Sequence, residues 1–299
     1  MPFAAASLAA RQPARSDAVP LLCAALAAAS FISMDSVIKL MSLRFDALQL
    51  SFFRFAGGSV FAVALWLWKR SPLPSTSAWR LHFARSALLL CSLLGYFFAL
   101  TQLPLVQAVT ISYLAPIFVA VLAIPVLNEH PAASIWLALV AGLSGVLISV
   151  YPEFRRSLSG GTAAHLLGMA SAAAAALSFA GVMLLARRQS GRDSIWTILL
   201  VQSVLPLLLL AGPAVWRWRP IQAGDIALIL LAGGLGTLGL LCLTHAFTRL
   251  EASRVAPLEY TGLVWATVLG YLLFGELPTP TTMVSAALVV GGCLLLLRR

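Results

Sequence analysis

Long apolar segments recur along the whole chain, and short turns rich in Pro, Gly, Ser or charged residues separate them. Most of these segments hold close to the roughly 20 residues that an α-helix needs to cross the hydrocarbon core of a membrane. The pattern predicts spans at residues 19–41, 47–68, 82–101, 104–127, 132–150, 163–186, 194–216, 224–247, 252–274 and 279–297. We therefore expect an all-α polytopic membrane protein with ten transmembrane helices.

Composition supports the lipid bilayer as the surroundings of this chain. Hydrophobic residues make up 61% of it and charged residues only 10%, whereas a soluble domain carries about 25% charged residues. The net charge of +10 is spread over short clusters between the apolar segments, such as Lys69-Arg70 and Arg187-Arg188. Such clusters are typical of membrane topology signals and not of a nucleic-acid-binding patch. We expect contact with lipid and no nucleic acid partner.

The cysteines give no sign of a metal site or a disulfide framework. Cys23, Cys91, Cys242 and Cys293 each lie inside an apolar segment, and none forms a close pair. This spacing predicts small packing residues. The chain also lacks the usual motifs for a catalytic nucleophile or a phosphate-binding loop. We therefore expect no metal, no cofactor and no enzymatic activity.

One glycine-rich segment imitates a nucleotide-binding motif. Residues 234–239 fit the dinucleotide pattern, but no strand precedes them and they lie inside a long apolar helix. Gly233, Gly236 and Gly239 are spaced by three residues. They predict a stripe of small residues for close helix packing.

Lysine and arginine are unequally shared between the predicted loops. With the N-terminus inside, thirteen fall in inner segments and six in outer segments. Because cytoplasmic loops are enriched in these residues, both termini are predicted to be cytoplasmic. The first apolar segment runs past the length of a signal peptide and lacks a clear cleavage site, so we expect it to remain as the first span after a tail of residues 1–18.

The two halves of the chain repeat each other. A shift of about 147 residues overlays 99–149 on 246–296 without a gap, so that Tyr113 meets Tyr260 and Glu129 meets Glu276. The chain thus divides into repeats at 19–150 and 163–299, with a linker at 151–162. Five spans are an odd number, so the second repeat must enter the membrane from the opposite side. Inverted five-helix repeats permit states open to either side, which favours a transporter over a membrane scaffold or an enzyme.

The turns that end two matched spans carry a resemblance. Asn128-Glu129-His130-Pro131 and Gly275-Glu276-Leu277-Pro278, each followed by a final span that bears Gly, resemble paired EamA domains of the drug/metabolite transporter superfamily. Asn128 departs from the usual Gly-Glu pair of that family. The resemblance implies a ten-helix basket around a central cavity that moves small organic metabolites across a bacterial inner membrane, and it leaves a homodimer open.

The start of the first repeat resembles one bacterial branch of this superfamily. Met34-Asp35-Ser36-Val37-Ile38-Lys39 precedes Gln49 and Phe52-Phe53-Arg54, as in proteins for the uptake of riboflavin and S-adenosylmethionine. Uptake of such a heterocyclic compound is the substrate expectation. Efflux of an amino acid or a drug is the alternative.

Three ionisable residues of the first two spans are predicted to share one depth. Asp35 and Lys39 are four residues apart and lie on one helix face. Asp35 lies roughly 9 Å and Arg54 about 10 Å below the same surface, at 1.5 Å per residue. Ionisable groups inside a membrane are costly and mark functional sites. They are candidates for substrate contact, or for a structural ion pair from which Lys39 reaches outward.

The ninth span supplies the other candidates. Glu259 follows Pro257, which is expected to interrupt the helix, and His245 is a candidate partner of its carboxylate. This pair is a candidate for carrying a coupling proton; pairing of Glu259 with Arg254 or Arg249 is the alternative.

Aromatic residues complete the predicted site. Tyr113 and Tyr260 are repeat equivalents beside Pro116 and Pro257, and interrupted helices at matching places point to a central site. Tyr96 and Trp265 are candidates for stacking on a planar ligand or for simple packing. Glu129 and Glu276 are expected to be structural residues of the turns.

Overall fold

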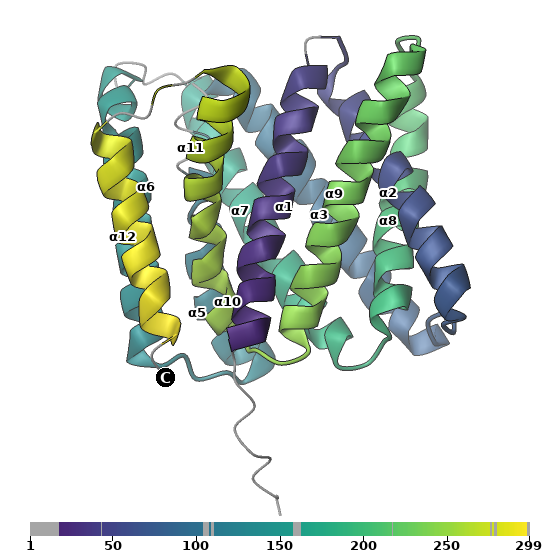
Figure 1. Ribbon diagram of the computed structural model, residues 1–299, viewed down its shortest axis with the longest axis horizontal. Coiled ribbons are helices and arrows are strands. Elements are labelled where there is room, and N and C mark those ends of the chain that lie inside the picture. Colours follow the sequence, from purple (N-terminus) through teal and green to yellow (C-terminus); the bar gives the residue numbers. More distant parts are fainter. Residues whose placement is uncertain are drawn as a thin grey trace, which may run out of the picture.

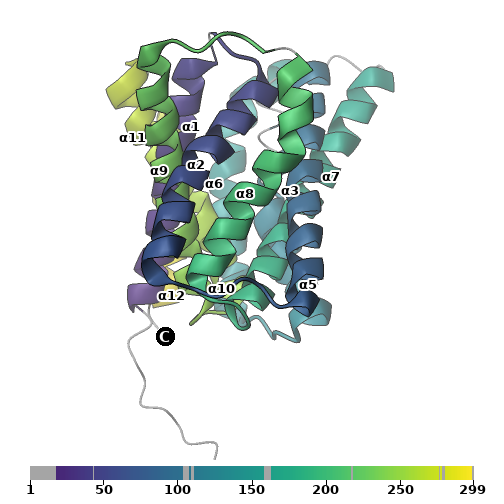
Figure 2. The same cartoon turned by 90° about the vertical axis from the view of Figure 1, so that its right-hand side faces the viewer.

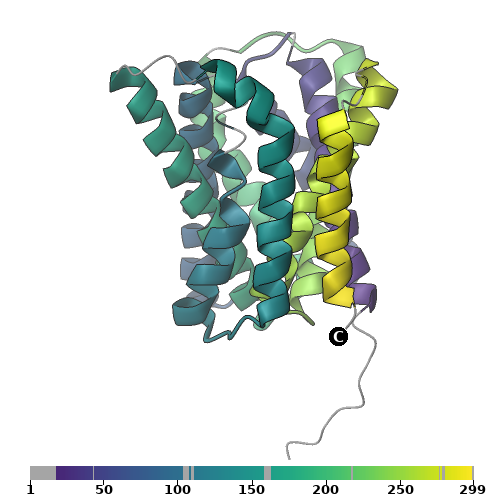
Figure 3. The ribbon, with the colours of Figure 1, turned by 90° about the vertical axis from the view of Figure 1, so that its left-hand side faces the viewer.

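The computed structural model describes residues 18–42, 44–103, 108, 111–157, 163–216, 218–275, 277 and 280–297. Within these residues every element is a helix, and the helices stand side by side as one bundle (Figures 1–3). They are α1 (Ala18–Met41), α2 (Ala47–Lys69), α3 (Thr76–Gln102), α5 (Ala115–Leu127), α6 (Ala133–Ser157), α7 (Ala163–Ser190), α8 (Ile195–Trp216), α9 (Ala223–Phe247), α10 (Ala252–Val255), the 3-10 helix η1 (Ala256–Tyr260), α11 (Thr261–Phe274) and α12 (Pro280–Leu297).

These helices confirm the predicted all-α membrane fold. By length and hydropathy α1, α2, α3, α7, α8 and α9 can each cross a bilayer, and α5, α6 and α12 contain shorter apolar helices. The chain is a multi-pass membrane protein. In the spans that form one uninterrupted helix, two boundaries differ from the expectation by more than four residues: α3 begins six residues earlier, at Thr76 and not at residue 82, and α6 continues through the first part of the predicted linker to Ser157.

The ninth predicted span is interrupted in the way that its proline suggested. It consists of α10, η1 and α11 in succession, and Pro257 lies in the first turn of η1. In the first repeat, α5 begins at Ala115 with Pro116 in its first turn. Residues 104–107, 109 and 110 of the fourth predicted span lie outside the described residues. Both interruptions place a tyrosine just before the continuous helix: Tyr260 directly precedes α11, and Tyr113 lies two residues before the start of α5.

The matched turns of the two repeats have matching backbones. Asn128 ends α5 with φ 54°, and Gly275 ends α11 with φ 67°. Both residues are in the left-handed region, which Gly adopts freely and which Asn tolerates better than most residues. The departure of Asn128 from the family pattern therefore keeps the geometry of the turn.

Helix packing repeats as well. α1 packs along α9 just as α7, its equivalent in the second repeat, packs along α3, and α6 packs along α12. The α6–α12 contact brings Gly145 and Gly292 to the interface. A Cβ added to Gly145 would lie 2.8 Å from the Ser285 carbonyl oxygen, and one added to Gly292 would lie 3.1 Å from the Ala141 Cβ. These glycines are repeat equivalents, so the contact is symmetric.

One pair of helix contacts breaks the symmetry. α2 packs closely on α9, and a Cβ added to Gly233 would lie 2.1 Å from the carbonyl carbon of Gly57. The repeat equivalents of this pair, α8 and α3, touch far less. The bundle is therefore packed more tightly at α2–α9 than at α3–α8.

Candidate functional site

A cavity of about 250 Å³ lies in the middle of the bundle, where the two repeats meet. Helices α1, α2 and α3 of the first repeat and α7, α8 and α9 of the second all contribute to its lining. Its ionisable lining residues among those described are Asp35, Arg54 and Arg85. Asp35 carries one negative charge against two positive charges, so the lining has a net charge of +1.

Asp35 and Arg54 both line the cavity, one from α1 and one from α2. Their charges interact electrostatically. The side chain of Asp35 is exposed, and this exposure is toward the cavity. The guanidinium carbon of Arg54 lies 5.5 Å from the centre of the Phe55 ring. Lys39, the third predicted member, is exposed near the end of α1 and does not line the cavity.

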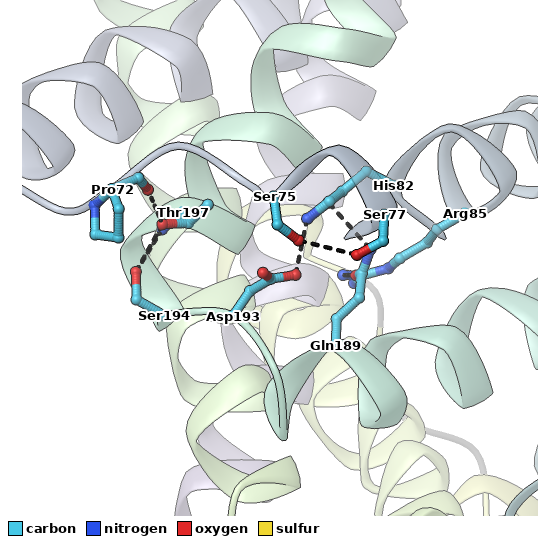
Figure 4. A network of polar contacts seen from close by, with 9 residues as sticks. All are labelled: Pro72, Ser75, Ser77, His82, Arg85, Gln189, Asp193, Ser194 and Thr197. Carbon is cyan, nitrogen blue, oxygen red and sulfur yellow. Dashed lines mark hydrogen bonds and ion pairs between the residues drawn. The ribbon is translucent and has the colours of Figure 1, made fainter. Parts of the chain in front are cut away.

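Arg85 is a cavity residue that the sequence did not single out. It is 3% exposed, and its Nη1 donates to Gln189 Oε1 at 2.8 Å. Since that amide oxygen accepts from Arg85, the amide nitrogen of Gln189 donates to His82 Nδ1 at 3.0 Å, and His82 Nε2 then donates to Asp193 at 3.1 Å. Figure 4 shows this chain of contacts, which joins α3 to the end of α7 and the turn after it.

A smaller cavity of about 170 Å³ lies beside the first and contains Glu259. The two share a wall of apolar side chains, namely Phe31, Phe179, Met183 and Leu243. No ion pair within the described part of the chain includes the carboxylate of Glu259, so neither Arg249 nor Arg254 neutralises it. His245 is half-buried in α9 and is not its partner in this structure.

The predicted tyrosines come together, whereas the tryptophan does not join them. The rings of Tyr113 and Tyr260 lie 6.0 Å apart, and the Tyr260 hydroxyl donates to the Tyr113 carbonyl at 3.1 Å. Tyr113 interacts electrostatically with Tyr96, Asp35 and Glu259. Trp265 is 41% exposed on α11 and lines neither cavity.

At one end of the bundle, polar contacts join the turn after α1 to the segment before α9 and to the first turn of α9. Arg44 pairs with Asp225 at 2.7 Å, and Arg219 donates to the Arg44 carbonyl at 2.7 Å. The buried amide of Gln49 both donates to and accepts from the backbone of Arg219. We call Arg44, Gln49, Arg219 and Asp225 the clasp. It joins the two repeats next to the α2–α9 contact.

Glu129 has the structural role that was expected of a turn residue. Its carboxylate accepts hydrogen bonds from the backbone N–H groups of Ala252 at 2.9 Å and Ser253 at 3.0 Å. It thereby caps the first turn of α10, where backbone donors lack helical partners. Its predicted equivalent, Glu276, lies outside the described residues.

The glycine stripe of α9 packs as predicted. A Cβ at Gly236 would lie 2.9 Å from the sulfur of Met34, and one at Gly239 would lie 2.7 Å from the Phe31 ring. Together with Gly233 on α2, the stripe lets α9 approach both α1 and α2 closely.

Comparison with known proteins agrees with this architecture. The model of the EamA-like transporter family matches residues 19–151 and again residues 166–298. The chain belongs to the EamA-like transporter family. The two matches cover nearly all of the described helices, and the family places the chain among membrane transporters of small metabolites.

Curated relatives of this EamA-like chain are named as transporters. The S-adenosylmethionine uptake transporter of Rickettsia prowazekii (strain Madrid E) is 24% identical over 88% of this chain and 87% of its own. The pseudopaline exporter CntI of Pseudomonas aeruginosa (strain PAO1) is 29% identical over 93% and 95%. The riboflavin transporter of Rhizobium johnstonii is 28% identical over 86% and 83%. These names include both uptake and export.

A solved structure shares the fold of this EamA-like chain. A crystal structure superposes with a TM-score of 0.75 over 91% of this chain and 97% of the other, at 19% sequence identity. At that identity the likeness concerns the fold alone.

Proposed function

We propose that this chain is a secondary transporter, and not an enzyme, that carries a small organic metabolite across the bacterial inner membrane by alternating access. The observation that carries the proposal is the central cavity between the repeats, with Asp35 and Arg54 on its wall. Charged groups inside a membrane are costly, and they face a cavity when they serve a substrate. The interrupted helices beside Tyr113 and Tyr260 add support, since such breaks occur at the sites of transporters built from repeats.

The asymmetric helix packing supports a moving bundle. α2–α9 is packed and held by the clasp, whereas the equivalent pair α8–α3 touches little. In an inverted repeat, exchanging the conformations of the two halves gives the opposite state. Transport would then break the clasp, separate α2 from α9 and bring α3 onto α8.

The proposed orientation puts the clasp on the outer face. The excess of Lys and Arg in the loops on the opposite side favours a cytoplasmic location for both termini. In agreement with an even number of crossings, α1 begins and α12 ends at the same end of the bundle (Figure 1). In this orientation Arg44 and Asp225 close the outer side.

An S-adenosylmethionine-like or riboflavin-like compound is the first substrate candidate. It rests on the names of two relatives and on the short motif around Asp35. Phe31, Phe55 and Phe179 line the central cavity and offer flat apolar surfaces for a planar ring. Tyr96 stays a prediction for the same task, whereas Trp265, which lines neither cavity, is not proposed for it.

Efflux is the second candidate. The exporter among the relatives covers the chain slightly more completely than the two named for uptake or riboflavin transport. The inverted repeat itself is compatible with either direction, because the coupling gradient sets the direction of flux.

Glu259 is the proposed site of a coupling proton. Its carboxylate lies among apolar side chains in the smaller cavity, without an ion-pair partner in the described part of the chain. A carboxylate can take up and release a proton, and one that faces a cavity inside the membrane is a typical member of a proton relay. The apolar wall that it shares with the central cavity would let a change at Glu259 be felt there.

The test is flux into proteoliposomes that contain the purified chain, with labelled S-adenosylmethionine, riboflavin and a set of amino acids. We expect exchange of at least one compound, and a fall of at least about tenfold in Asp35→Asn, because a charged contact is lost. Lys39→Gln is the matched control on the same helix and should keep its flux. Absence of flux for every compound would contradict transport, and unchanged flux in Asp35→Asn would contradict the site.

A further inference from the structure

Arg85 is a buried cation without a carboxylate partner among the described residues. Its Nη1 is bonded to the neutral amide of Gln189, and its Nε–H donates to no described acceptor although it is buried. Asp193 belongs to the same network but is separated from Arg85 by His82 and Gln189 (Figure 4). A buried charge is costly unless an opposite charge and hydrogen bonds compensate it. Arg85 therefore has the charge and the donor to bind an anion in the cavity that it lines.

A second donor lines the same cavity from the other repeat. Gln202 on α8 is 4% exposed, and its Nε2 also donates to no described acceptor. α3 and α8 begin at the same end of the bundle, where Thr197 donates to the Pro72 carbonyl at 2.7 Å. From the helix starts, Arg85 lies roughly 14 Å and Gln202 roughly 10 Å along the axis, at 1.5 Å per residue. The two unpaired donors thus lie at similar depth.

We propose that Arg85 and Gln202 form a subsite for a carboxylate group of the transported compound. Both groups offer N–H donors, and a carboxylate is an acceptor with two oxygens that suits a guanidinium. The net charge of the lining, +1, matches a carboxylate better than a doubly charged phosphate. Asp35 lies near the end of α1 and Arg54 near the start of α2, on the side of the clasp, so this pair would contact a separate polar or cationic part of the same molecule.

The subsite also has a role in the conformational cycle. α3 and α8 are the helices that touch little in this structure and whose equivalents, α2 and α9, are packed together. A carboxylate that accepts from Arg85 and from Gln202 at once would draw α3 toward α8. This role rests on the proposed function, in which the approach of α3 to α8 is the other half of the transport cycle.

A ligand-free test uses Gln202→Glu, which supplies a carboxylate from the protein itself. In the purified full-length chain we expect this change to raise Tm by about 2–4 °C, as Arg85 gains an ionic partner. In an Arg85→Gln background the same change should lower Tm, because the new carboxylate is then buried alone. In an Arg54→Gln background, which is the matched control, the gain should persist. An equal effect of Gln202→Glu with and without Arg85 would overturn the subsite.

A second test uses sodium benzoate and benzamide as probes, which differ only in the carboxylate. We expect benzoate to raise the Tm of the wild-type chain, with an apparent affinity that falls at least about tenfold in Arg85→Gln and in Gln202→Glu. Benzamide should have no comparable effect. Equal action of the two probes on the wild type would contradict the proposal. If no compound is transported in the flux experiment but the Tm changes are as expected, the transport function would be refuted and the anion subsite would stand.

Discussion

The hydroxyl of Tyr260 donates a hydrogen bond to the backbone carbonyl of Tyr113, at 3.1 Å and a separation of 147 residues along the chain. That separation equals the shift that overlays the two repeats. Two equivalent residues can touch only near the axis that relates the repeats. The contact therefore marks the centre of the repeat arrangement, and it joins residues at the interruptions before α5 and α11.

Tyr260 is packed tightly enough at this point for small changes to matter. A Cβ added to Gly142 would lie 2.2 Å from Cδ2 of the Tyr260 ring. We expect Gly142→Ala to cost about 1–3 kcal/mol of stability, and Tyr260→Phe about 1 kcal/mol through the lost hydrogen bond. Thermal unfolding of the purified protein measures both. Gly291→Ala, which has nothing within 4 Å, is the control. Equal unfolding of the Gly142 and Gly291 variants would rule out tight packing against Tyr260.

The α2–α9 contact leads to a second stability prediction. A Cβ at Gly57 would lie 2.3 Å from the Ile229 carbonyl oxygen, and backbone cannot yield as a flexible side chain can. Gly57→Ala and Gly233→Ala should each lower stability by about 1–3 kcal/mol. Gly234→Ala, beside them on α9, meets only the Phe61 ring at 3.4 Å and should be close to neutral. A loss in Gly234→Ala as large as in Gly233→Ala would show that the cost is not from this crossing.

The sequence predicted most of the fold but only part of the site. Apolar segments fixed the helix positions, because a span must be both long and apolar. Arg85 escaped notice because Arg80, His82 and Arg85 lower the hydropathy at the start of the third span. The predicted start was therefore residue 82, which left Arg85 near the membrane surface, whereas α3 begins at Thr76 and carries it inward.

Partners across the bundle were harder to predict than positions along it. Asp35 and Arg54 were placed at one depth by counting along two adjacent helices, and the structure brings them to one cavity. His245 was a candidate partner of Glu259 because the two lie at a similar depth in the membrane, but they do not interact in this structure. The rotation of each helix about its axis decides which side chains meet, and depth along the chain does not give that rotation. Trp265 is on the exposed side of α11 for the same reason.

The cap of α10 gives a local prediction. Removing the carboxylate in Glu129→Ala leaves the N–H groups of Ala252 and Ser253 without their acceptor. Amide hydrogen exchange at these two residues should become at least about tenfold faster, since hydrogen bonds to charged groups contribute about 1.5–3 kcal/mol. Glu251→Ala is the matched control, because Glu251 precedes α10 and makes no side-chain hydrogen bond to it. Unchanged exchange in Glu129→Ala would refute the cap.

The clasp is predicted to control access to the central cavity. Leu89→Cys, in a Cys91→Ser background, places a reporter thiol on the cavity lining. Arg44→Glu should make a membrane-impermeant maleimide label this thiol a few-fold faster, because the clasp loses its ion pair. A partly exposed ion pair contributes about 1 kcal/mol, which corresponds to a change of this size.

Restoring the opposite charges tests whether the pair itself is responsible. Combining Arg44→Glu with Asp225→Arg should return the labelling rate to that of the unmodified clasp. A double variant that labels as fast as Arg44→Glu alone would mean that the Arg44–Asp225 pair does not hold the clasp shut.

The most direct test of alternating access is the labelling of the Leu89→Cys thiol from each side of the membrane, in right-side-out and inside-out vesicles. We predict labelling from both sides. A short crosslink between Arg44→Cys and Asp225→Cys should abolish labelling from the outer side alone, and Leu94→Cys, which is 49% exposed on the same helix and not on the cavity wall, should stay unlabelled. Labelling of the uncrosslinked protein from one side only, or labelling from the outer side that persists after the crosslink, would contradict a cavity that opens alternately to the two sides.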